Sequence, residues 1–154
     1  MMKKHTKNIY DLVSTVFGLG YFPVAPGTLG SFAGLFLCIP LHPFVGLYVT
    51  TFIILFILGV ITSSITEKKN RKKDPSYIII DEFVNIFPVF LFVPITFFTV
   101  IMGFILYRFF DVTKIYPIKE LEKVKSGWGI MLDDFLSAVY ANIVLHLILF
   151  FCSI

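Results

Sequence analysis

Charge is scarce in this chain of 154 residues. Only 15% of the residues are Asp, Glu, Lys or Arg, whereas 57% are hydrophobic and 18% are aromatic. Soluble domains carry about 25% charged residues, and the mean hydropathy here is +0.88. This composition excludes an ordinary soluble enzyme and argues equally against disorder and against nucleic-acid binding. The length fits a single domain over residues 1–154, which we expect to lie mostly in a lipid bilayer.

Cysteine and histidine are also rare. Cys38 and Cys152 both lie in apolar runs, where a thiol behaves as a small hydrophobic group. Neither is followed six positions later by the arginine that a cysteine phosphatase requires. His42 and His146 lie in or beside apolar runs distant from the clustered acidic residues, and His5 lies in the N-terminal tail. The sequence therefore favours neither a disulfide framework nor a zinc site, and it argues against a covalent cysteine or histidine mechanism.

Three long stretches contain no charged residue: 12–66, 83–107 and 135–154. A helix needs about 20 apolar residues to span a bilayer, so the first stretch has room for two helices. Pro40 and Pro43 mark the turn between them, because proline lacks a backbone donor and resists helix continuation. The sequence thus predicts a short helix, a full-length helix and a last helix over residues 28–39, 44–66 and 132–151.

The stretch 83–107 is flanked on both sides by basic residues, in segments 68–73 and 108–125. Basic loops prefer the cytoplasmic side, so a single crossing would place one segment on the wrong side. Pro94 can break the stretch into two arms of about a dozen residues, each about 18 Å long. We therefore predict an all-α, polytopic integral membrane bundle of short and full-length helices with a proline-broken hairpin. Its N-terminus and both basic loops would face the cytoplasm, where the loops either set the orientation or attract anionic lipid.

This topology gathers polar residues on one side of the membrane. Half of the ten acidic residues fall in this group: Asp81, Glu82, Asp111, Asp133 and Asp134. Clustered carboxylates without Cys or His partners suit Mg²⁺. The simpler alternative is that acidic pairs at helix starts only cap the helix and oppose its dipole. Arg108, Asp111 and Lys114 are spaced three apart, so one helix face could present them to a common ligand.

A Gly- and Pro-rich segment, 18–27, precedes the short helix, which Thr28 or Ser31 would begin. Free backbone N–H groups and hydroxyls at a helix start suit a phosphate. The alternative is a glycine-rich loop with a threonine cap. A second glycine-rich piece, 126–132, leads into Asp133; it either lets the backbone approach a ligand or ends the basic segment.

Taken together, four motifs resemble the phosphatidylglycerophosphatase A family over residues 18–141. They are Gly-Tyr-Phe-Pro-Val-Ala-Pro-Gly-Thr-Leu-Gly-Ser, Asp-Glu-Phe-Val, Tyr-Arg-Phe-Phe-Asp with its following Lys, and Gly-Trp-Gly-Ile-Met-Leu-Asp-Asp. The resemblance implies a small helical enzyme of the bacterial cytoplasmic (inner) membrane. It would use Mg²⁺ to remove the terminal phosphate of phosphatidylglycerophosphate, leaving phosphatidylglycerol. Its partners would be the phospholipid substrate and membrane lipids, with no nucleic acid and no obligatory protein partner.

The chemistry of a phosphomonoester gives these residues their expected roles. The phosphate charge must be neutralised, a water aimed and the leaving alkoxide stabilised. The metal ligands and a carboxylate that orients water would come from Asp81, Glu82, Asp133 and Asp134. Asp111 would be another ligand or would position Lys114. The phosphate would be held by Arg108, Lys114, Thr28 and Ser31.

Three positions depart from the family pattern. Asn85 stands where the family usually has Gly, Ile115 where Pro usually follows the lysine, and Ser137-Ala138 where Ala-Gly is usual. Asn85 would add either a ligand or a perturbation one turn from Asp81. Two other functions stay open: a phosphatase of another lipid phosphate such as phosphatidic acid, and a non-enzymatic membrane transport subunit. The carboxylates flank the apolar runs instead of interrupting them, which favours a surface site over an ion path.

Overall fold

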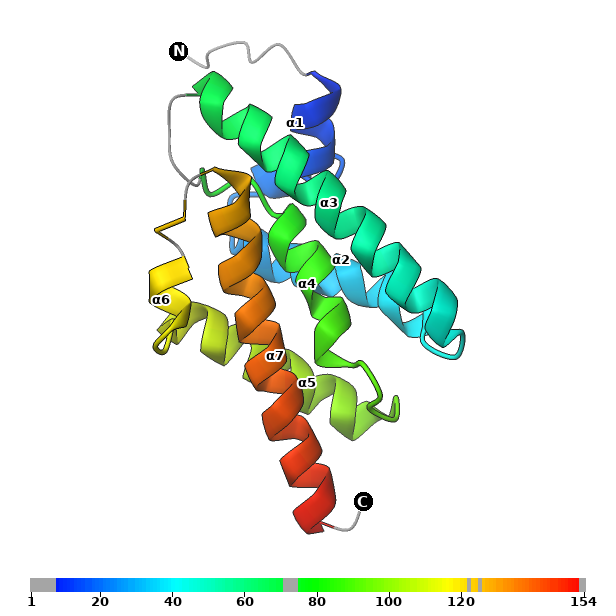
Figure 1. Ribbon diagram of the computed structural model, residues 1–154. Helices are drawn as coiled ribbons and strands as arrows, with labels where there is room; N and C mark the ends of the chain where they lie inside the picture. The colour runs from blue at the N-terminus through cyan, green and yellow to red at the C-terminus, as the bar shows by residue number, and fades with distance from the viewer. Residues whose placement is uncertain (1–7, 71–74, 122, 125, 153–154) are drawn as a thin grey trace.

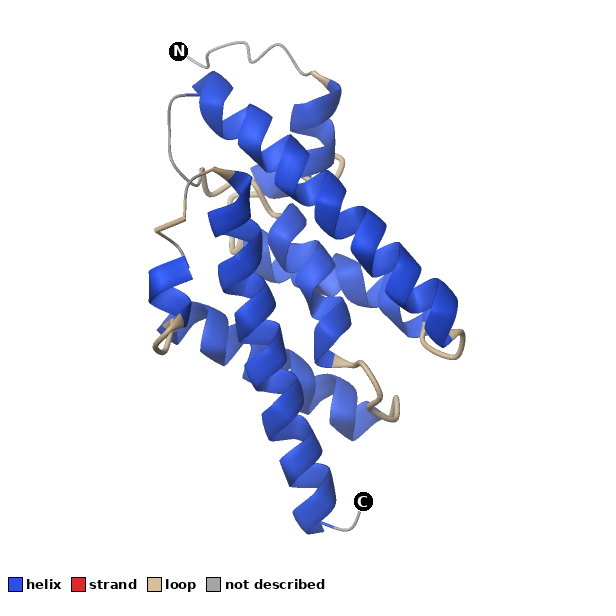
Figure 2. Ribbon diagram, viewed as in Figure 1, coloured by secondary structure: helices blue, strands red, loops and turns tan. Residues whose placement is uncertain are grey.

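The computed structural model describes residues 8–70, 75–121, 123–124 and 126–152, and these contain helices and loops but no strand (Figures 1 and 2). The all-α prediction is confirmed. The helices are α1 (Ile9–Ser14), α2 (Pro26–Leu41), α3 (Val45–Asn70), α4 (Ile80–Val89), α5 (Phe97–Thr113), α6 (Ile118–Leu121) and α7 (Gly127–Cys152), with a 3₁₀ turn η1 at Leu19–Tyr21.

Two helices, α3 and α7, are long and apolar enough to cross a membrane, with 26 residues each. At 1.5 Å per residue each is about 39 Å long, which exceeds the hydrocarbon thickness of a bilayer. They approach each other closely through glycines. A Cβ on Gly59 would lie 2.7 Å from Met131 Sδ, and one on Gly127 would lie 2.2 Å from the Val60 carbonyl oxygen.

The proline-broken hairpin is confirmed. Helix α4 ends at Val89, α5 begins at Phe97, and Pro94 lies in the loop between them. Arg108 of α5 reaches to within 3.9 Å of Glu82 at the start of α4, so α5 returns the chain to its starting level. With 10 residues, α4 is about 15 Å long and is too short to span a bilayer.

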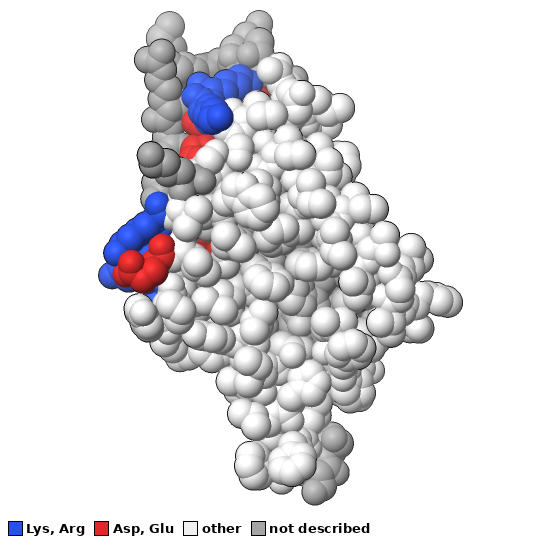
Figure 3. Space-filling view, viewed as in Figure 1, with Lys and Arg blue, Asp and Glu red and all other residues white. Residues whose placement is uncertain are grey.

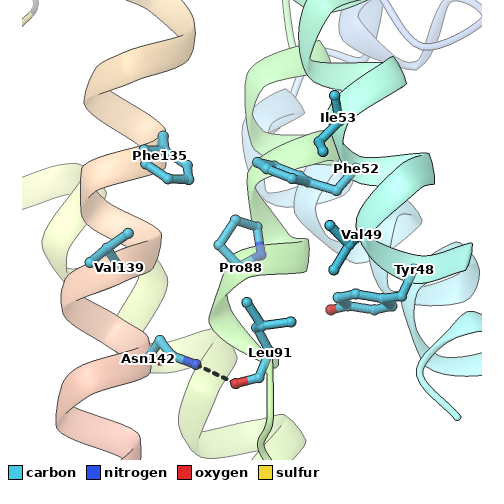
Figure 4. A pocket seen from close by; sticks show the side chains of 9 residues that line it. All are labelled: Tyr48, Val49, Phe52, Ile53, Pro88, Leu91, Phe135, Val139 and Asn142. Atoms are coloured by element: carbon cyan, nitrogen blue, oxygen red, sulfur yellow. Dashed lines mark hydrogen bonds between the residues drawn. The ribbon is translucent and has the colours of Figure 1, made fainter. Parts of the chain in front are cut away.

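Side chains from outside the hairpin cap the C-terminal end of α4, here called its inner end. The acceptors are the backbone carbonyl oxygens of Phe87, Val89, Phe90 and Leu91. Tyr48 Oη donates to the first at 2.6 Å, Asn142 Nδ2 donates to the second and fourth at 2.9 and 3.0 Å, and His42 Nε2 lies 3.1 Å from the third. Figure 4 shows the bond from Asn142 to Leu91. These bonds satisfy carbonyl groups that would be costly to leave unpaired within a bilayer.

Helix α4 is also the centre of the hydrophobic core. Val84, Ile86 and Phe87 have no exposed surface, and α2, α3, α5 and α7 all contact this helix. The α4 arm of the hairpin therefore lies inside the bundle, where the surrounding helices shield its backbone from lipid.

Two helices begin earlier than the sequence predicts. Helix α2 starts at Pro26 instead of Thr28, and α7 starts at Gly127 instead of Leu132. Asp133 and Asp134 therefore lie almost two turns inside α7, so the expectation that they open this helix is wrong, and capping does not explain them. Contact of Gly127 with α3 overrides the low helix propensity of glycine.

Charged side chains are segregated in the described part of the molecule. On the face seen in Figure 3 they lie in the upper and left part of the view, and the rest of that face carries none. Large apolar side chains are exposed instead, including Ile53, Ile57 and Leu147. Such a surface is suited to lipid.

Candidate active site

A cavity of about 270 Å³ lies where four helices meet. Its walls come from the starts of α2 and α4, the end of α5 and the second turn of α7. Of the site residues that the sequence predicts, it brings together Thr28, Asp81, Glu82, Arg108, Asp111, Lys114, Asp133 and Asp134. These positions span more than a hundred residues of sequence, and the hairpin is what brings them together.

Asp81, Glu82 and Asp134, here called the carboxylate trio, form a group that could hold a metal ion. One oxygen from each lies within 4.8 Å of the others. Among the described residues, Glu82 Oε2 is buried and has no hydrogen-bond partner. Burial raises the pKa of Glu82 to about 7, because the charged carboxylate is poorly solvated there. A bound cation would reverse this shift, and all three donors are the hard oxygen atoms that Mg²⁺ prefers.

The two cations of the cavity are each paired with an aspartate. Arg108 Nη1 lies 2.7 Å from Asp111 Oδ2, and Lys114 Nζ donates to Asp133 Oδ2 at 2.7 Å. Asp133 Oδ1 also accepts the backbone N–H of the next residue at 3.0 Å. The structure thus places Asp133 against Lys114 and outside the carboxylate trio, and it places Asp111 against Arg108.

Lys114 lies just beyond the end of α5 instead of on the same face as Arg108. It has a left-handed backbone with φ of 45°, a conformation that is unfavourable for a residue with a side chain. Such conformations are concentrated at functional sites. The turn leaves Lys114 lining the cavity beside Asp133.

The start of α2 contributes backbone donors. Ala25 precedes the helix with φ of 46°, and no side chain caps this end. The N–H groups of Gly27 and Thr28 precede the first intrahelical bond, which Leu29 donates to Ala25. Gly27 packs directly on Glu82, since a Cβ at Gly27 would lie 2.0 Å from Glu82 Oε1. This close approach brings a helix end with free N–H groups, which could bind an anion, beside the carboxylate trio.

Ser31 is the one predicted site residue that the cavity does not include. It is fully buried, and its hydroxyl donates to the Gly27 carbonyl oxygen at 3.2 Å, one turn back in the same helix. The Ser31 hydroxyl is therefore engaged in a hydrogen bond within α2.

Two uncharged residues that were not predicted as site residues also make hydrogen bonds near the cavity. Tyr107 is fully buried, and its hydroxyl donates to Asp134 Oδ2 at 2.8 Å. Asn85 is fully buried and donates to the Met131 carbonyl oxygen at 3.1 Å, which links α4 to α7. Tyr107 lies next to Arg108 in a predicted motif, and this adjacency was the available signal.

The described residues thus form a small apolar helical bundle with a charged cavity at one end, an arrangement compatible with a membrane protein. Comparison with known proteins agrees. The family model of phosphatidylglycerophosphatase A matches residues 12–149, and the chain belongs to this family, whose activity is that of a phosphatase.

Three relatives are similar over most of their length. A phosphatidylglycerophosphatase A of Haemophilus influenzae is 37% identical over 92% of this chain and 89% of the relative. A putative phosphatidylinositol-3-phosphatase of Bacteroides thetaiotaomicron is 34% identical over 87% and 89%. A phosphatidylglycerophosphatase A of Escherichia coli is 30% identical over 92% and 84%. No solved structure matches the chain.

Proposed function

We propose that this protein is a Mg²⁺-dependent phosphatidylglycerophosphatase that hydrolyses phosphatidylglycerophosphate to phosphatidylglycerol and phosphate. Two relatives with that name, from H. influenzae and E. coli, support the substrate. The observation that carries the metal requirement is the charge of the cavity, whose lining among the described residues has five carboxylates against two cations. A phosphate dianion would be repelled by this lining unless a further cation were bound.

The carboxylate trio fits that cation. Asp81, Glu82 and Asp134 would hold it, since their oxygens converge within 4.8 Å and the described lining of the cavity contains no Cys or His. When bound, Mg²⁺ supplies positive charge that polarises the phosphoryl group and favours ionisation of water. In this proposal Asp133 is a positioning residue for Lys114 instead of a ligand.

The other residues bind and orient the phosphate. Arg108 and Lys114 neutralise the phosphoryl oxygens, and the backbone N–H groups at the start of α2 donate to them with the Thr28 hydroxyl. A water attacks phosphorus as the bond to the glycerol oxygen breaks, and the proton that the water loses balances the proton that the leaving alkoxide takes up. A carboxylate of the cavity orients that water.

We further propose that the protein is multi-pass in the bacterial cytoplasmic membrane and that the cavity faces the cytoplasm. Lys68 and Lys69 lie in the last turn of α3 and Lys119 lies in α6, which follows α5, so these basic residues are at the cavity end of the bundle. This distribution supports a cytoplasmic position for that end. Four basic residues of the predicted loops, at positions 71–73 and 125, lie outside the described residues.

A second candidate keeps the chemistry and changes the lipid. The B. thetaiotaomicron relative bears the name of a putative phosphatidylinositol-3-phosphatase, so similar chains carry different substrate names. The same cavity would then bind the phosphate of another lipid phosphomonoester.

The test is phosphate release by the purified protein in detergent, first with Mg²⁺ and then with EDTA. The substrates are phosphatidylglycerophosphate, phosphatidic acid, phosphatidylinositol 3-phosphate and a soluble phosphomonoester. We expect metal-dependent release from phosphatidylglycerophosphate above the others. Preference for another lipid would establish the second candidate, and release unchanged by EDTA would contradict the metal requirement.

A further inference from the structure

An apolar groove of about 270 Å³ runs along the outside of the bundle between α2 and α5. Its α2 wall includes Phe32, Leu35, Phe36 and Ile39, and Val100 lines it from α5. Phe32 and Phe36 are 53% and 72% exposed. In a bilayer this surface would meet hydrocarbon, and the phosphatase chemistry above makes no use of it.

Residues that line the groove follow residues that line the cavity at helical spacing on both α2 and α5. On α2, Phe32 follows Thr28 by four residues and Phe36 follows by eight, so the three lie on one face. On α5, Val100 and Arg108 are separated by eight residues in the same way. Thr28 and Arg108 both line the cavity, so residues of the cavity and residues of the groove follow one another along both helices.

The two helices are antiparallel, with α2 running away from the cavity and α5 running toward it. One turn from the cavity, the rings of Phe32 and Phe104 meet edge to face with centroids 6.4 Å apart. At the cavity itself, Arg108 Nη2 would lie 3.4 Å from a Cβ on Gly27. The two helices are therefore joined by side chains near the cavity and separated by the groove farther along.

We propose that this groove holds an acyl chain of the phospholipid whose phosphate occupies the cavity. This inference rests on the proposed function and adds how the lipid part of the substrate is recognised. From Thr28 to Ile39 the helix advances about 16 Å, which is close to half of the hydrocarbon thickness of about 30 Å. A chain in the groove would thus extend through one leaflet while its head group stays at the membrane surface.

A second apolar groove, of about 300 Å³, provides the comparison. It lies between α3, α4 and α7, and its lining includes Val49, Phe52 and Pro88 (Figure 4). The bond from Asn85 to the Met131 carbonyl oxygen joins α4 to α7 between the cavity and this groove. None of the residues that line this second groove belongs to α2 or α5, so they serve as controls.

The first experiment fills each groove with a larger side chain. Val100→Phe narrows the α2–α5 groove, and Val49→Phe is the matched control in the other. The substrates are dipalmitoyl and dioctanoyl phosphatidylglycerophosphate and the deacylated head group. We expect Val100→Phe to lower kcat/KM for the dipalmitoyl lipid about tenfold. This is the loss expected when a few methylene groups of the acyl chain are no longer buried. Its rate with the deacylated compound should stay unchanged, and Val49→Phe should change neither. An equal loss on all substrates, or no loss at all, would overturn the proposal.

The second experiment does not depend on turnover. A non-hydrolysable phosphonate lipid and a phosphatidylcholine, each with a diazirine in the acyl chain, are crosslinked to the wild-type protein in micelles. We expect the phosphonate probe to label peptides from α2 and α5 several-fold more than the phosphatidylcholine probe, and Val100→Phe to abolish the difference. Equal labelling by both probes would contradict a substrate-specific groove.

The two proposals can fail separately. If wild-type protein releases phosphate and Val100→Phe keeps the wild-type dependence on chain length, the groove proposal fails and the phosphatase proposal stands. If wild-type protein releases no phosphate from any lipid but the phosphonate probe labels the groove selectively, the phosphatase proposal fails and lipid binding in the groove stands.

Discussion

Asp134 is the residue on which most contacts of the cavity converge. It belongs to the carboxylate trio, accepts a hydrogen bond from Tyr107 at 2.8 Å, and its N–H donates to Asp133 at 3.0 Å. The hydrogen bond from Tyr107 orients this carboxylate before any ligand binds. Its buried position inside α7, away from the helix start, is difficult to explain by stability alone.

We expect Asp134→Asn to lower kcat by at least about 100-fold, because it removes one negative ligand while nearly preserving the side-chain volume. The measurement is phosphate release as Mg²⁺ is titrated, with circular dichroism to confirm helical content. Glu120→Gln is the control, since Glu120 forms an exposed ion pair with Lys123 at 2.7 Å, and it should keep wild-type activity. Wild-type turnover by Asp134→Asn would exclude Asp134 from the chemistry.

Gly27 tests how closely α2 must approach the carboxylate trio. A methyl group at this position would lie 2.0 Å from Glu82 Oε1, whereas one on Gly46 would have no atom within 4 Å. We expect Gly27→Ala to displace Glu82 or α2 at a cost of about 1–3 kcal/mol and to lower kcat/KM about ten- to a hundredfold. Gly46→Ala is the matched control and should be silent. Equal activity of the two variants would show that the contact is not needed.

Most of the cavity could be predicted from the sequence because charge is so rare in this chain. A carboxylate or cation such as Glu82 or Lys114 is conspicuous among apolar residues, and position at the border of an apolar run indicates its level in the membrane. Hydroxyl groups give no such signal. Only its place next to Arg108 distinguishes Tyr107 from other core aromatics, and the burial of Ser31 depends on how α2 packs.

At the scale of the helices, the inner end of the hairpin is held by hydrogen bonds from other helices. Asn142 donates to two carbonyl groups, at 2.9 and 3.0 Å. We expect Asn142→Leu to lower the free energy of unfolding by about 1–3 kcal/mol, because buried carbonyl groups lose their donor. The thermal midpoint in detergent should fall, and activity per folded molecule should be largely kept. Ile143→Leu, at an exposed neighbouring position, is the control. An unchanged midpoint in Asn142→Leu would mean that these bonds add nothing to stability.

The hairpin was predictable, and the helix starts were not. A basic segment on each side and Pro94 near the middle were enough to indicate a return to the same side of the membrane. The starts of α2 and α7 lie in glycine- and proline-rich segments, which by themselves disfavour helix. Contacts of Gly27 with Glu82 and of Gly127 with Val60 stabilise these turns, and such contacts are not visible in a single sequence.

For the whole molecule, the arrangement gives a definite orientation to test. Lys68 and Lys119 are exposed near the cavity end, and Gly46 lies at the opposite end of α3. In a background with Cys38→Ala and Cys152→Ser, single cysteines at these positions are labelled with a membrane-impermeant reagent. We expect Lys68→Cys and Lys119→Cys to react only from the cytoplasm and Gly46→Cys only from outside, as the positive-inside rule requires.

Labelling of Lys68→Cys and Lys119→Cys from opposite sides would replace the hairpin with a single crossing. Labelling of both from the outside would keep the hairpin and reverse the orientation. Tyr140→Cys, at a partly exposed position near the middle of α7, should react from neither side. It therefore controls for leakage of the reagent.

The capping of α4 also bears on how this chain could change during evolution. The acceptors at its inner end are all backbone carbonyl groups, which every amino acid provides, whereas the donors are the side chains of Tyr48, His42 and Asn142. Substitutions at the acceptor positions can leave every bond in place, but a substitution at a donor removes one. Among related sequences we therefore expect free exchange of apolar residues at the hairpin tip and persistent hydrogen-bond donors on the surrounding helices.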